Sequence, residues 1–154
     1  MNIALDLLQY QSHLRFEKRD GKSCLFDPIR KKYIVKTPEE LVRQLMILYL
    51  IESGGYNKTR IAVEKELLIN QRKKRFDILI YSQDYQPHIL IECKAPNIKL
   101  TDATFRQAAC YNFELKADYL IITNGISTYC CEMDYEEEDY VFLERVPKVS
   151  TVIN

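Results

Sequence analysis

Three charged side chains interrupt two short apolar segments that are typical of buried β-strands. Asp77 lies within residues 76–81, and Glu92 and Lys94 lie within residues 88–95. Because side chains two residues apart in a strand point to the same face, Glu92 and Lys94 are expected to emerge side by side. If the two strands pair, three ionisable groups converge beside a hydrophobic core.

Two carboxylates and a lysine at one place permit metal-assisted hydrolysis. Carboxylate oxygens, a backbone carbonyl and water form the all-oxygen site that Mg²⁺ or Mn²⁺ prefers. Such an ion polarises a phosphodiester oxygen, lowers the pKa of a bound water and stabilises the departing oxyanion. Lys94 would orient the attacking water or help to deprotonate it. A structural ion pair between Glu92 and Lys94 is the alternative, although burying such a pair is a poor device for stability.

The elements that must position these groups begin with a helix. Thr37 is predicted to be its N-cap, Pro38 its first residue and Glu40 the second half of a capping box, and the helix ends near residues 54–55. A second helix is expected at about residues 102–117. Strands are expected at residues 60–70, 76–81, 88–95, 119–123, 128–133 and 140–146.

This order predicts an α/β fold in which a mixed β-sheet is flanked by helices and ends in a C-terminal β-hairpin. The 154 residues suit a single domain, with residues 1–36 as an irregular segment packed on it. Within that segment, residues 33–35 could form a short strand. No apolar run is long enough to span a membrane, and the first residues lack the pattern of a secretory signal. Five scattered cysteines favour reduced thiols in a cytoplasmic protein.

The net charge of zero argues against a large nucleic-acid-coating surface, which is normally basic. Two local basic runs are nevertheless present, at residues 30–32 and at Arg72, Lys73, Lys74 and Arg75. The second run comes just before Asp77, where contacts to backbone phosphates would position a nucleic-acid strand. A solvated loop is the ordinary alternative for either run.

The spacing of Asp77 and the run Glu92-Cys93-Lys94 resembles the D…(D/E)-x-K signature of the PD-(D/E)XK nuclease superfamily. The surrounding sequence resembles the N-terminal nuclease domain of type I restriction enzyme R subunits, and more closely the small stand-alone bacterial proteins built from that domain. The stretches that carry this resemblance are residues 26–32, 37–44, 75–77, 91–96, 106–111 and 123–125. The resemblance implies a restriction-endonuclease-like sheet.

The resemblance also implies roles for single residues. Asp77 and Glu92 would be the metal-binding carboxylates, the carbonyl of Cys93 a further ligand, and Lys94 the catalytic lysine. Glu40 matches an acidic helix residue that often completes the site in this superfamily, although its capping-box role explains it equally well.

A second helix supplies further candidates. Gln107 and Tyr111 are four residues apart and therefore share one helix face. They resemble a Gln-x-x-x-Tyr element that supports the site and the DNA in several nuclease branches. Glu64 and Glu66, on the first long strand, are competing acids that are otherwise explained as solvated side chains.

These inferences favour a nuclease domain that depends on Mg²⁺ or Mn²⁺ and hydrolyses phosphodiester bonds of DNA. Two alternatives stay open: a catalytically silent nucleic-acid-binding module of the same fold, and a protein-interaction subunit. The sequence lacks a Gly-x-x-x-x-Gly-Lys phosphate loop, so no ATP site is expected and the helicase-like motor of the R subunits does not transfer. A homodimer or another protein partner is left open.

Overall fold

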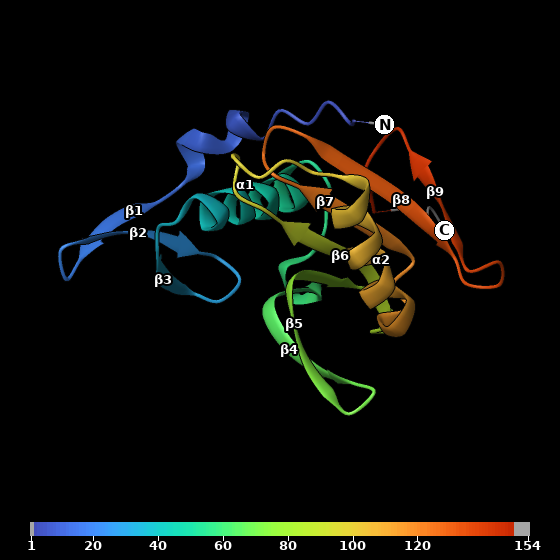
Figure 1. Cartoon of the computed structure of the whole chain (residues 1–154). Coiled ribbons are helices and arrows are strands. Elements are labelled where there is room, and N and C mark those ends of the chain that lie inside the picture. Colours follow the sequence, from blue (N-terminus) through green and yellow to red (C-terminus); the bar gives the residue numbers. More distant parts are fainter. Residues whose placement is uncertain (1, 150–154) are drawn as a thin grey trace, which may run out of the picture.

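The centre of the computed structural model, which describes residues 2–149, is a six-stranded mixed β-sheet (Figure 1). Neighbouring strands follow the chain order from β4 to β9, and all pairs are antiparallel except β6 and β7. The strands are β4 (Ile61–Ile69), β5 (Arg72–Tyr81), β6 (Pro87–Cys93), β7 (Tyr119–Thr123), β8 (Thr128–Asp134) and β9 (Asp139–Leu143).

Two α-helices cover opposite faces of this sheet. Helix α1 (Pro38–Glu52) precedes β4, and α2 (Asp102–Leu115) forms the crossover that the parallel pair β6 and β7 requires (Figure 1). The sequence order of helix, three strands, helix, strand and hairpin is therefore confirmed. None of the described helices is both long and apolar enough to cross a membrane.

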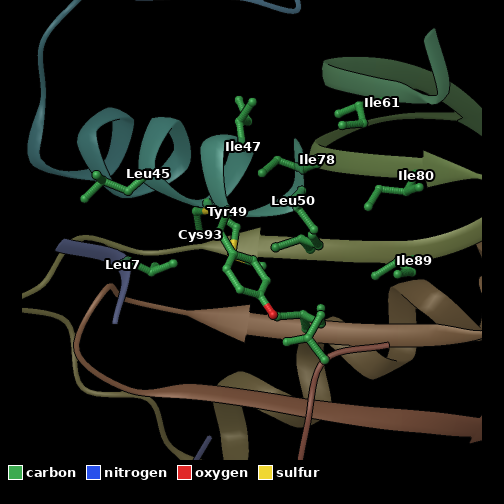
Figure 2. Close-up of a cluster of buried hydrophobic side chains, with 14 of the residues drawn as sticks. Leu7, Leu45, Ile47, Tyr49, Leu50, Ile61, Ile78, Ile80, Ile89 and Cys93 are labelled. Carbon is green, nitrogen blue, oxygen red and sulfur yellow. The ribbon is translucent and has the colours of Figure 1, made fainter. Parts of the chain in front are cut away.

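The central strands are apolar on both sides, so each face has its own core. On β6, Ile89, Ile91 and Cys93 belong to the cluster beneath α1, whereas Leu90 belongs to the cluster beneath α2. Figure 2 shows the α1 cluster, in which Leu45 and other helix side chains meet the isoleucines of β5 and β6. Glu92 is two residues after Leu90 in the same strand, so its side chain points to the same face, the α2 side of the sheet.

Local signals fix where the two helices begin. The Thr37 hydroxyl accepts a hydrogen bond from the Glu40 amide at 3.0 Å, and Pro38 occupies the first turn of α1. At α2, Thr101 and Thr104 form a reciprocal capping box. Helix α2 ends at Lys116, whose left-handed backbone closes the last turn.

The sequence predicted a mainly irregular N-terminal segment, but the structure shows regular elements there. It contains a short 3₁₀ helix, η1 (Leu7–His13), and a separate antiparallel sheet of three strands. The strands of this sheet are β1 (Phe16–Arg19), β2 (Lys22–Asp27) and β3 (Lys32–Val35). The pattern of β1 and β2 gave no clear signal because all four residues of β1 are exposed and only part of β2 is buried.

The basic run at residues 72–75 also differs from the loop alternative, because it belongs to strand β5. Asn70 and Gln71 both have positive φ, as the central residues of a tight type I′ hairpin turn require. Pairing of β4 with β5 therefore starts immediately at Arg72. The resulting hairpin extends away from the central sheet (Figure 1).

Candidate active site

Strand register brings Asp77 and Glu92 together. Ile78 on β5 pairs with Ile91 on β6, so the next residues outward, Asp77 and Glu92, are neighbours across the two strands. The Cys93 amide donates a 2.9 Å hydrogen bond to Asp77 Oδ2. The Asp77 carboxylate therefore satisfies a backbone donor at the point where the ladder of β5 and β6 ends.

The Glu92 carboxyl group is held where ionisation is unfavourable. Burial raises its pKa to about 8, and the adjacent Asp77 carboxylate acts in the same direction, while Lys94 opposes the shift. Two carboxylates this close resist carrying two negative charges, and a cation between them relieves the repulsion. The pair is thus an electrostatically unfavourable arrangement that a bound cation would stabilise.

A small pocket of about 80 Å³ opens beside Glu92 on the α2 side of the sheet. Glu92 and Lys94 form one wall of this pocket, and Gln107 and Tyr111 from α2 form another. The remaining lining residues are Thr104, Ala108 and Ile122. The structure therefore brings together the Glu-x-Lys and Gln-x-x-x-Tyr elements, which are separated by a loop and the start of α2.

The basic run divides between the two faces of β5. The Lys74 ammonium lies 4.0 Å from the centre of the Tyr111 ring, which places it next to the pocket. Arg72 is exposed at the hairpin turn. Lys73 and Arg75 are also exposed and lie 3.7 Å and 3.5 Å from Glu66 and Glu64, respectively.

Arg43 was not among the predicted site residues, yet it contacts the site directly. Its Nη2 atom lies 2.7 Å from Asp77 Oδ1 and 2.9 Å from Glu64 Oε1, and its Nη1 donates to Glu40. Arg43 is buried, and these carboxylates raise its pKa despite the opposing effect of burial. Its charge compensates several acids, while its Nε has no hydrogen-bond partner in the described part of the chain.

A sequence signal for Arg43 existed but is weak. Arg43 follows Glu40 by three residues, a spacing that also occurs on solvated helix faces. Here the face is buried, because Glu40, Arg43 and Ile47 are all shielded from solvent. Only the packing of α1 on the sheet distinguishes this arginine from an ordinary surface residue.

Glu40 does not close a capping box. Its backbone amide donates to Thr37, as predicted, but its carboxylate accepts hydrogen bonds from Arg30, Arg43 and Gln44. The side chain is buried and reaches Asp77 only through Arg43. Glu40 thus lies behind the Asp77–Glu92 pair, as part of a charged network.

Glu64 is the member of the competing acid pair that turns toward the site. Glu64 is on β4, directly across from Asp77 of β5, because its neighbours Val63 and Lys65 both pair with β5. Its backbone φ is +53°. A left-handed backbone is unfavourable for a residue with a side chain, and such conformations concentrate at functional sites. Burial raises the pKa of Glu64, with Arg43 acting in the opposite direction. Glu66 is exposed.

The loop that carries Lys94 is held by the turn after β7. The Lys94 amide donates to the Thr123 carbonyl at 2.8 Å, and the Asn124 side-chain amide donates to the Ile98 carbonyl at 2.8 Å. The side-chain Oδ1 of Asn124 also accepts hydrogen bonds from the backbone amides of Ile126 and Ser127 in the same turn. These contacts give residues 123–125 a structural role in positioning Lys94.

The donor set fits a hard divalent cation. Among residues 2–149, no group of three or more His, Cys, Asp or Glu side chains is arranged to hold a metal ion. Asp77, Glu92 and the Cys93 carbonyl instead offer only oxygen atoms. Mg²⁺ commonly binds through one or two carboxylates and completes its shell with water and substrate phosphates.

Comparison with known proteins gives a family match. The family model for the type I restriction enzyme R protein N terminus (HSDR_N) matches residues 38–147. No curated protein matches the chain. Among solved structures, a fragment assigned to an HsdR subunit of a type I restriction enzyme from Vibrio vulnificus YJ016 is 21% identical, with a TM-score of 0.45, and the match covers 66% of this chain and 22% of that chain. The chain belongs to the family of type I restriction enzyme R protein N termini.

Proposed function

We propose that this chain is a divalent-metal-dependent nuclease domain that hydrolyses phosphodiester bonds of DNA. The observation that carries the proposal is the Asp77–Glu92 pair, in which the pKa of Glu92 is raised to about 8. Lys94 lines the same pocket as Glu92. A carboxyl group with a strongly shifted pKa beside a lysine is typical of catalytic sites. Family membership supports DNA as the substrate.

In this proposal, Asp77, Glu92 and the Cys93 carbonyl would hold Mg²⁺ or Mn²⁺. When bound, the ion supplies Lewis-acid polarisation of the phosphate and lowers the pKa of a coordinated water. Lys94 orients the attacking water and offsets the negative charge that develops on the phosphate oxygens. Arg43 donates a hydrogen bond to the Asp77 carboxylate and fixes its orientation.

The residues around the pocket would hold the strand. Gln107 and Tyr111 line the wall opposite Lys94, where their polar atoms are available to the sugar-phosphate backbone. Lys74 stands over the Tyr111 ring, and Arg72 is on the same face of β5. Lys73 and Arg75 carry positive charge on the other face of the strand. Contacts of this kind position nucleic acid without reading its sequence, so binding should weaken as salt rises.

The direct test is metal-dependent cleavage. Purified protein is incubated with supercoiled plasmid and with end-labelled single- and double-stranded DNA, in Mg²⁺, in Mn²⁺ and in EDTA. We expect cleavage with either metal and none with the chelator. DNA binding without cleavage under every condition would overturn the proposal in favour of a silent binding module, and the plasmid and end-labelled products distinguish internal from terminal cleavage.

Metal binding should be linked to the proton of Glu92. Because the pKa of Glu92 is about 8, the group is largely protonated at neutral pH, and an incoming cation must displace that proton. The Mg²⁺ affinity should therefore rise about tenfold per pH unit below this value and level off above it. Calorimetric titration in two buffers of different ionisation enthalpy measures the proton released.

The matched control for this titration is Glu66→Gln, which removes an exposed carboxylate from β4. That variant should bind Mg²⁺ as the unchanged protein does, whereas Glu92→Gln should lose both the metal affinity and the proton release. A Mg²⁺ affinity that is independent of pH, or equal in the two variants, would contradict the assignment of Glu92.

A further inference from the structure

The zero net charge conceals a strong separation of charge along the chain. Residues 15–36 contain eight basic and three acidic side chains, a net charge of +5. Residues 128–145 contain seven acidic side chains and one basic side chain, a net charge of −6. The basic segment corresponds to the β1–β3 sheet and its flanking residues.

Most of these cations face solvent. Seven of the eight basic residues of the segment are exposed: Arg15, Lys18, Arg19, Lys22, Lys31, Lys32 and Lys36. The eighth, Arg30, turns inward to Asp27 and Glu40. The surface potential of this sheet is therefore positive, because only Glu17 and Asp20 oppose it on the outside.

Aromatic rings are interleaved with the cations on one face of the sheet. Arg15 lies over the Phe26 ring at 4.5 Å and Arg19 over the Tyr33 ring at 4.3 Å, and the centres of the two rings are 5.3 Å apart. Lys22 pairs with Arg19 in the hairpin and shares this face. Arginine stacked on aromatic rings beside free lysines is a pattern that nucleic-acid-binding surfaces use.

The sheet is anchored next to the Asp77–Glu92 pair. Asp27, at the end of β2, is buried and bonds Arg30 and Gln44, and Arg30 also bonds Glu40. From Glu40 the contacts continue through Arg43 to Asp77. Figure 1 shows the β1–β3 sheet beside the start of α1, with the β4–β5 hairpin extending from the central sheet in another direction.

We propose that the β1–β3 sheet binds the phosphate backbone of the same DNA whose scissile phosphate lies at Asp77 and Glu92. The sheet precedes residues 38–147, the part of the chain that the family model matches. The inference rests on the proposed function and adds a second contact region to it. An acidic protein surface, such as residues 128–145 of a second copy, is the competing occupant.

The test compares two double variants in DNA binding. Arg19→Gln with Lys22→Gln removes two exposed charges from the aromatic face of the sheet, and Lys58→Gln with Lys148→Gln removes two exposed charges outside it. Both are made in the Lys94→Ala background without divalent metal, so that no DNA is cut. Fluorescence anisotropy of a labelled duplex gives Kd over a range of salt concentrations.

We expect the sheet variant to bind several-fold more weakly at low salt. Each lost phosphate contact should reduce the slope of log K against log salt by about 0.9, giving a reduction of about 1.8 for the pair. The control variant should keep the slope of its Lys94→Ala parent. Equal slopes in both variants, or a change in self-association by sedimentation without a change in DNA binding, would overturn the inference.

The outcomes also separate this inference from the proposed function. If the unchanged protein cleaves DNA with metal and the sheet variant binds like the control, the β1–β3 sheet is not a DNA-binding surface, and the nuclease proposal is unaffected. If the unchanged protein never cleaves DNA but the sheet variant loses DNA affinity, the nuclease proposal is wrong, and the β1–β3 sheet is still a DNA-binding surface. Equal urea midpoints for the two double variants establish that the comparison concerns binding.

Discussion

Replacing Lys94 by alanine should reduce DNA cleavage by about a hundred- to a thousand-fold while leaving DNA affinity nearly unchanged. Lys94 lines the pocket beside Glu92, where its charge would face the phosphate that is being hydrolysed. Loss of a group that acts mainly on the transition state lowers kcat and kcat/KM together, with little effect on substrate binding. Initial cleavage rates and anisotropy titrations of the same preparation measure both quantities.

Lys99→Ala is the matched control, because Lys99 is an exposed lysine in the loop that follows β6. It removes the same charge without touching the pocket and should cut at the normal rate. If Lys94→Ala and the unchanged protein cleave equally, the activity comes from a contaminant or from another site. A loss of DNA affinity as large as the loss of rate would instead make Lys94 a binding residue.

Replacing Arg43 by methionine should lower the free energy of unfolding by about 3–5 kcal/mol. The variant retains most of the side-chain volume but leaves the carboxylates of Asp77, Glu40 and Glu64 without their shared cation. An uncompensated charge that cannot reach water is costly, which is why removing one partner of a buried ion pair destabilises more than removing both. Urea unfolding monitored by circular dichroism measures the change.

Arg106→Met provides the control, since Arg106 is exposed on α2. Its effect should remain within about 0.5 kcal/mol, as is usual for surface substitutions. Adding Asp77→Asn to Arg43→Met should restore part of the lost stability, because Asp77 bonds no other cation in the described part of the chain. A loss below about 1 kcal/mol, or no restoration in the double variant, would show that the network is not electrostatically coupled.

The central fold was accessible from sequence because its signals are local. Thr37 and Thr101 are capping residues that mark the helix starts. The segments that form β5 to β7 contain apolar runs, which are typical of buried strands and not of loops. Their boundaries agree with the predicted ones to within a few residues, except where the Asn70–Gln71 turn extends β5 to Arg72. In the N-terminal sheet only the strand at residues 33–35 was predicted, and β1 and β2 were missed because they are short, polar and only partly buried.

Asp77, Glu92 and Lys94 could be predicted from the sequence as a candidate site, because charge is rare in apolar strands. The sequence could not determine what surrounds them. Arg43 joins the site because α1 packs on the sheet, and Glu64 joins it because β4 pairs with β5. The β1–β3 sheet is linked to the site through the buried Asp27 and its partner Arg30. Such contacts join residues far apart in the chain, and no local periodicity encodes them.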